Sequence, residues 1–185
     1  MVTTTTPTPA PVPAYLEDGM VKTIVAKTIA DTSAPKVTEL TGANVLLDLS
    51  LYLTADGFSM THSQDSIDDD REGLAEIGTI PGQEKYTDTT LRVIDNTNRA
   101  GSGSTAVANE AVEKLTKGTS CFIVRRRGMP AAEPFAAGQT VTVLPVTIGI
   151  KTAVAHAANQ RQLSQITYSV TPGAQDETAK VVAGD

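Results

Sequence analysis

Apolar and polar residues alternate in several short stretches of the chain, and this pattern predicts a protein built mainly from β-strands. The alternation is clear at 85–94, where Leu91 and Val93 share one face, and again at 161–171. A period of two places successive side chains on opposite faces of a strand. Further strands are expected over four other segments: 21–30, 58–66, 120–127 and 139–151.

The segment 139–151 changes phase along its length. Val141 and Val143 share one parity, whereas the later apolar residues Val146, Ile148 and Ile150 share the other. Pro145 lies at the change and removes a backbone donor. We therefore expect a bulge or a strand break at Pro145 that would restore one apolar face.

Residues 105–116 form the one segment with a convincing helical pattern. Its apolar residues recur at spacings of three and four and make one stripe: Val107, Ala111, Val112 and Leu115. Lys114 and Lys117 stand near the C-terminal end, where the helix dipole favours positive charge. Gly118 is placed to end the helix. We expect an α-helix at about 105–116.

Turn-forming residues bound a long segment in the middle of the chain. Residues 54–57 (Thr-Ala-Asp-Gly) and 81–82 (Pro-Gly) carry turn signals. The segment 54–84 is long for a connection within a compact domain, and such loops usually have a function. We expect it to be a loop, extended at 58–66, that reaches an adjacent subunit or ring.

The two ends of the chain differ in composition from the middle. Residues 1–20 form a Pro/Thr-rich arm, in which the alternating prolines exclude a helix or a central strand. The pattern predicts one β domain at 21–172, followed by a solvated tail at 173–185.

Polar faces on the predicted strands constrain the fold. The strand 161–171 presents Gln165, Thr167 and Ser169 opposite its apolar face, and 85–94 carries Arg92 opposite Leu91 and Val93. A persistently polar face must meet water or a wet cavity. The expected fold is mainly β, an antiparallel β-sandwich with one α-helix and extended terminal arms.

Charge and composition limit the partners of the chain. The formal net charge of −6 does not favour binding to phosphates, so a protein of this kind should let DNA slide. No apolar run approaches the ~20 residues of a membrane span, and the N-terminus has no signal-peptide pattern. The single cysteine, Cys121, stands in an apolar run and is expected to be a small buried hydrophobe in a protein made in the cytoplasm.

An acidic stretch has some of the residues of a metal site. Residues 68–73 (Asp-Asp-Asp-Arg-Glu-Gly) resemble the start of a calcium loop, but Thr79 stands where a bidentate Glu is required. The alternatives are a solvated mobile loop or an electronegative surface that repels DNA or meets a basic partner. We take the acidic residues as candidates for contacts between subunits or for a channel wall: Asp65, Asp68, Asp69, Asp70, Glu72 and Glu76.

Other constellations do not predict catalysis or a cofactor. The glycine-rich segment 101–104 lacks a following Lys-Ser or Lys-Thr pair, so it does not match a phosphate loop. His62 and His156 show no metal-ligand spacing. No catalytic, cofactor-binding or metal-binding residue is therefore assigned.

The basic run Arg125, Arg126 and Arg127 is a further candidate. On a strand these side chains alternate between faces, so they do not form a single basic patch. The run is either exposed charge at a strand end or a set of partners for carboxylates on a neighbouring subunit.

Four segments resemble a known family. These are residues 48–58 (Asp-Leu-Ser-Leu-Tyr-Leu-Thr-Ala-Asp-Gly-Phe), 94–98 (Ile-Asp-Asn-Thr-Asn), 122–128 (Phe-Ile-Val-Arg-Arg-Arg-Gly) and 135–141 (Phe-Ala-Ala-Gly-Gln-Thr-Val). They are similar to segments of tail tube (major tail) proteins of long-tailed phages that infect actinobacteria, and they occur in the same order. The resemblance spans about 21–172.

The resemblance implies a structural protein of the virion, assembled in the host cytoplasm. Such proteins form six-fold rings that stack into a hollow tube around a continuous inner β-barrel. Tape-measure, terminator and baseplate proteins are implied as partners, and DNA passes through the lumen without specific binding. On this reading, 85–94 and 161–171 are expected to face the lumen.

Two other classes of protein stay open at the level of sequence. One is another virion module, either a head–tail connector or an immunoglobulin-like decoration or adhesion domain, because such modules also have many short strands. The other is a small hydrolase that uses His62 or His156.

Overall fold

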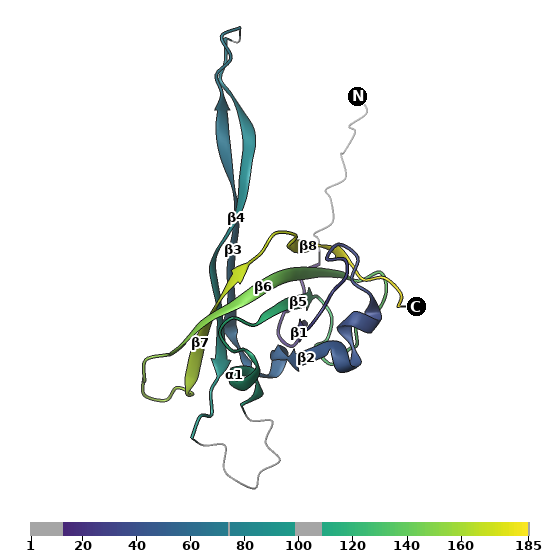
Figure 1. Cartoon of the computed structure of the whole chain (residues 1–185), viewed down its shortest axis with the longest axis vertical. Coiled ribbons are helices and arrows are strands. Elements are labelled where there is room, and N and C mark those ends of the chain that lie inside the picture. Colours follow the sequence, from purple (N-terminus) through teal and green to yellow (C-terminus); the bar gives the residue numbers. More distant parts are fainter. Residues whose placement is uncertain (1–12, 74, 99–108, 185) are drawn as a thin grey trace, which may run out of the picture.

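The computed structural model describes residues 13–73, 75–98 and 109–184, and its strands form one eight-stranded antiparallel sheet (Figure 1). The strands are β1 (Val21–Ala26), β2 (Val45–Asp48), β3 (Leu53–Asp69), β4 (Gly78–Ile94), β5 (Ser120–Arg127), β6 (Thr140–Ala153), β7 (Leu163–Val170) and β8 (Gln175–Lys180). Their order is β2-β1-β5-β6-β7-β4-β3, with β8 paired to β6. The helical elements are η1 (Val37–Leu40), η2 (Gly42–Asn44), η3 (Leu49–Leu51) and α1 (Glu110–Lys114). The prediction of a mainly β, antiparallel fold is confirmed, and the described residues contain one α-helix, as expected.

Two hydrophobic clusters lie on opposite faces of the central strands, which gives the fold its sandwich-like layering. On β5, Ile123 packs in the first cluster and Val124 in the second, and neither side chain is exposed. Residues of α1 and of β4 and β7 help to form the first cluster, whereas β8 and η1 contribute to the second. The central strands are therefore buried on both faces, which requires apolar residues at both parities.

The double burial corrects the prediction of a break at Pro145. The β5–β6 register runs without a shift through the pair Phe122 and Pro145. Val143 packs in the second cluster and Val146 in the first. The change of phase reflects two covered faces along one continuous strand.

The C-terminal residues form part of the core, so the expected solvated tail is wrong. Strand β8 pairs with β6, and the side chains of Ala179 and Val181 are buried in the second cluster. The backbone of Val181 also accepts a hydrogen bond from Gly138 and donates one to Gln139. The sequence pattern did not indicate this strand, because β8 is short and has few apolar residues among its charged and polar ones.

The expected loop 54–84 is a long hairpin, which corrects that prediction. Strands β3 and β4 each have 17 residues, and the hairpin projects well beyond the rest of the described molecule (Figure 1). The turn signals at 54–57 and 81–82 lie inside the strands, where the register shifts. A Cβ on Gly57 would lie 2.6 Å from the carbonyl oxygen of Arg92, so glycine permits the close backbone approach there.

The described part of the helix is shorter than expected. It covers Glu110–Lys114, while 105–108 and the segment 101–104 lie outside the described residues. Ala111 and Leu115 of the expected apolar stripe are buried in the first cluster, whereas Val107 lies outside the described residues. The backbone leaves the helix at Leu115, and Gly118, with φ of +88°, donates to Ile148 and directs the chain into β5.

Candidate assembly surfaces

The outer half of the hairpin is largely exposed. Ile67 and Ile80 are paired across the two strands, with exposed fractions of 60% and 43%, and Ile77 near the tip is 73% exposed. A two-stranded hairpin has no core of its own and is marginally stable in water. Within the described part of the chain, these isoleucines are apolar side chains that stay exposed on the hairpin.

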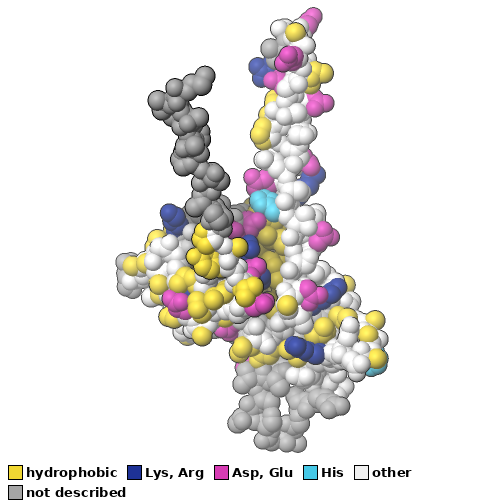
Figure 2. Space-filling model, turned by 180° about the vertical axis from the view of Figure 1, so that it is seen from behind, with side chains coloured by type: hydrophobic (Ala, Val, Ile, Leu, Met, Phe, Trp, Pro, Cys, Tyr) yellow, Lys and Arg dark blue, Asp and Glu magenta, His cyan; other side chains and the backbone are white. Residues whose placement is uncertain are grey.

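The acidic candidates gather at the same end of the hairpin. Residues 65–76 contain six acidic side chains and one arginine, hence a formal charge of −5 out of −6 for the whole chain. Figure 2 shows acidic side chains spaced along the hairpin toward its tip. Two of them are already paired locally, Asp65 with Lys85 and Asp69 with Arg71. The structure thus places all six candidates on one projecting element: Asp65, Asp68, Asp69, Asp70, Glu72 and Glu76.

The hairpin does not have the form of a calcium loop. Asp68 and Thr79, the first and twelfth positions of the tested pattern, are cross-strand partners. Among the residues that the structure describes, no group of three or more His, Cys, Asp or Glu side chains could hold a metal ion.

His62 lies at the base of the hairpin and links it to β8. Its ring stacks on Tyr86 with 4.3 Å between centroids. Nε2 lies 3.3 Å from Glu84 and Nδ1 lies 3.5 Å from Asp176 of β8. Burial and the two nearby carboxylates raise the pKa of Tyr86. His156 is exposed in the connection after β6, so the two histidines belong to different parts of the fold.

The three arginines of β5 alternate between faces, as predicted. Arg126 is buried and belongs to the interior of its own chain. Its guanidinium donates to the carbonyl oxygens of Pro130 at 2.8 Å and Pro134 at 2.9 Å, and lies over the ring of Phe135. Further donations go to Glu133 and Gln139. Arg126 therefore ties the connection between β5 and β6 to the sheet.

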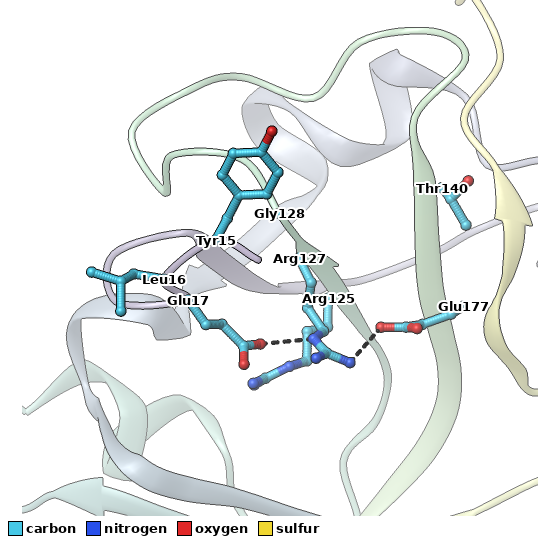
Figure 3. A pocket seen from close by; sticks show the side chains of 8 residues that line it. All are labelled: Tyr15, Leu16, Glu17, Arg125, Arg127, Gly128, Thr140 and Glu177. Carbon is cyan, nitrogen blue, oxygen red and sulfur yellow. Dashed lines mark hydrogen bonds and ion pairs between the residues drawn. The ribbon is translucent and has the colours of Figure 1, made fainter. Parts of the chain in front are cut away.

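Arg125 and Arg127 line a surface depression of about 460 Å³ on the other face (Figure 3). Arg127 bridges two elements, because its Nε lies 2.7 Å from Glu17 and its Nη1 lies 2.9 Å from Glu177 of β8. Arg125 lies over the ring of Phe58, 4.6 Å from its centroid. Tyr15 and Leu16 are highly exposed and complete the lining. This depression is a candidate contact surface of mixed charge.

The polar faces of β4 and β7 are adjacent. Thr90 pairs with Thr167 and Arg92 with Gln165 across the two strands, so all four side chains share one face. Leu91 pairs with Ile166 on the opposite face, inside the first cluster. The polar faces that the sequence predicted for 85–94 and 161–171 thus form one continuous polar surface, with a hydrophobic core behind it.

A buried polar cluster around Asp95 was not predicted. The carboxylate accepts from the hydroxyl of Ser164 at 2.6 Å and from the backbone of Thr97 at 2.9 Å, and it lies 3.3 Å from Lys151. Burial raises the pKa of Asp95, but these hydrogen bonds and Lys151 outweigh it and lower the pKa to about 2. The cluster fastens the end of β4 to β6 and β7. The Asp-x-Thr pattern, which favours a local side-chain turn, was the available signal.

The exposed hairpin, the depression at Arg125 and Arg127, and the polar face of β4 and β7 are surfaces that other chains could contact. The chain belongs to the phage tail tube protein family, whose model matches residues 9–184. No curated protein matches the chain. Members of the family are structural parts of the virion tail, are in general not enzymes, and assemble with copies of themselves and with other tail proteins.

The family match decides among the classes left open by the sequence. It confirms the resemblance to tail tube proteins and favours this class over a connector, a decoration or adhesion domain, or a hydrolase. No helix within the described residues has the length and apolar character to cross a membrane.

Proposed function

We propose that copies of this chain join side by side into six-membered rings, and that the rings stack into the hollow tail tube of a long-tailed phage of actinobacteria. Genomic DNA passes through the lumen without specific binding. The tube is assembled in the host cytoplasm, with a tape-measure protein and with terminator and baseplate proteins as further partners.

The polar face of β4 and β7 is the observation that carries this proposal. A channel filled with water needs a wall that is wet on one face and packed on the other, and closure of strands around an axis removes exposed sheet edges. The face with Thr90, Gln165 and Thr167 has both properties, because Leu91 and Ile166 lie behind it in the core. We assign this face to the lumen.

The hairpin is assigned to contacts with an adjacent subunit or ring. Its apolar surface of Ile67, Ile77 and Ile80 is exposed in the isolated chain, and burial of the area that each side chain still exposes would contribute on the order of 1 kcal/mol. The acidic residues beside these isoleucines meet basic groups of the partner. Such a contact repeated along one axis gives a filament, because it does not close on itself.

The arginines of β5 contribute unequally to such contacts. Arg125 and Arg127 border the surface depression, and the guanidinium of Arg127, which pairs with Glu17 and Glu177 of its own chain, is half exposed and can also meet carboxylates of a neighbouring subunit. Arg126 already donates to four groups of its own chain. Charge removal at Arg125 or Arg127 is therefore expected to weaken assembly with little effect on folding.

Electron microscopy tests the proposal. Concentrated protein, seeded with its initiating complex, is expected to give rings or long hollow tubes, and a helical reconstruction should show six-fold symmetry with β4 and β7 at the lumen. Ile67→Asp should prevent tube growth while the thermal stability of the subunit is kept. Ile150→Asp, at an exposed isoleucine outside the hairpin, serves as the control. Normal tube growth by the Ile67→Asp variant would show that the hairpin does not contribute to the contact between subunits or rings.

A further inference from the structure

The only charged side chain in the paired stretch of the polar face has its own counter-ion. Within Thr90–Ile94 and Leu163–Thr167, Arg92 is the single charged residue on the face that carries Thr90, Gln165 and Thr167. Its Nη1 lies 3.4 Å from Oδ2 of Asp56 on β3. The pair leaves this part of the sheet face without net charge.

A bulge in β3 brings Asp56 to this position. Leu53 pairs with Val93 and Phe58 with Leu91, so residues 54–57 lie opposite the single residue Arg92. Three additional residues are thus accommodated in β3, and Gly57 permits the close approach to the backbone of Arg92.

The carboxylate of Asp56 is held in its ionised form. The hydroxyl of Thr54 donates to Oδ1 at 2.9 Å. This hydrogen bond, then a bond from the backbone of Asp56 itself, and finally the charge of Arg92 lower the pKa of Asp56. The bulge therefore supplies both the anion and the donor that fixes its orientation.

Stability does not account for this arrangement. The side chains of Asp56 and Arg92 are 75% and 46% exposed, and an ion pair in such a setting contributes little to folding. The main effect of the pair is on the local charge. Without Asp56, the guanidinium of Arg92 would be unpaired, and an unpaired guanidinium is a strong ligand for phosphate.

We propose that Asp56 neutralises Arg92 so that the polar face of β4 and β7 does not retain nucleic acid. The proposal rests on the assignment of this face to the lumen. In a ring the same position is repeated in every subunit, so an uncompensated Arg92 would form a circle of cations around the passing DNA. With Asp56 in place, the phosphate backbone meets hydroxyl and amide groups and passes without being held.

Matched variants test the role of the ion pair. Asp56→Asn removes the counter-ion, and Asp56→Asn with Arg92→Gln removes both charges. Glu110→Gln is the control, because it frees Lys114 from an ion pair on α1, on the opposite side of the sheet, and changes the net charge by the same amount. Binding of labelled double-stranded DNA to the soluble subunit is measured by fluorescence anisotropy over a salt series.

The Asp56→Asn subunit is expected to bind DNA more tightly than the wild type and the Glu110→Gln control. Its salt dependence should be steeper by about one counterion per bound subunit. The double variant should return to the wild-type level. Equal binding by Asp56→Asn and Glu110→Gln, or tighter binding that persists in the double variant, would overturn the proposal.

Tubes provide a second and separate measurement. Where the variants assemble, co-sedimentation of labelled DNA with Asp56→Asn tubes should exceed that with wild-type tubes and should fall as salt is added. Failure of the wild-type protein to form tubes would refute the proposed function, while the comparison of soluble subunits would still decide whether Asp56 masks Arg92.

Discussion

Replacement of Asp95 by asparagine should destabilise the subunit by an amount that depends on pH. The folded pKa of about 2, against 3.8 for an ordinary aspartate, corresponds to about 2 kcal/mol of stabilisation by the ionised group at pH 7. The residue is only 4% exposed, so solvent screens its contacts with Ser164 and Lys151 weakly. Asp95→Asn removes the charge while nearly preserving the shape of the side chain.

The direction of the pH dependence follows from the lowered pKa of Asp95. The stabilisation is fully present above the unfolded pKa of 3.8 and is lost as the pH falls through the folded pKa of about 2. At pH 3 it should be about 1 kcal/mol smaller than at pH 7. The difference in stability between the wild type and Asp95→Asn should therefore narrow by this amount.

Urea unfolding followed by circular dichroism, at concentrations where the subunit stays monomeric, measures this difference. Asp70→Asn, at an exposed carboxylate on the hairpin, is the control for the loss of one negative charge, and its effect on stability at pH 7 should be small. An Asp95→Asn difference that is equally large at pH 7 and pH 3 would refute the electrostatic account of the cluster.

Three further changes test the packing of the fold. Arg126→Ala should destabilise the subunit in urea by about 3 kcal/mol, because four hydrogen-bond acceptors lose their charged donor, and an unchanged midpoint would contradict this role. Gly57→Ala should cost about 2 kcal/mol through the collision with the carbonyl oxygen of Arg92, whereas Gly73→Ala, where a Cβ meets open space, should cost much less. Burial raises the pKa of Cys121 to about 11, so a thiol reagent at pH 8 should label the native protein far more slowly than the unfolded chain; rapid native labelling would show that the thiol is accessible.

Local sequence patterns correctly predicted the position of several strands and which of their side chains are buried. The strand-like segment 120–127 and the alternating segment 161–171 correspond to β5 and β7, and the apolar parity of Leu91 and Val93 is the buried one. Even the alternation of the three arginines between faces follows from the geometry of a single strand. These features depend only on neighbouring residues, so the sequence was sufficient for them.

The candidate surfaces were only partly predictable. The polar faces of 85–94 and 161–171 were visible in the sequence, but their union into one surface required the pairing of β4 with β7. The acidic residues were singled out, yet their position on a projecting hairpin was not. The Asp95 cluster was missed because it joins residues from three strands that are distant in the chain.

By itself, the sequence of this protein determined its β class and its polar strand faces, because both follow from residue type at a period of two. It also determined where acidic residues are concentrated along the chain. Only the tertiary structure decided that 54–57 is a bulge rather than a turn, that β8 completes the second cluster, and that both faces of β6 are covered. Pairing between strands is a long-range property, and the same turn-forming residues fit a loop or an irregular strand. The choice between these depends on the partner strand, which the local sequence does not contain.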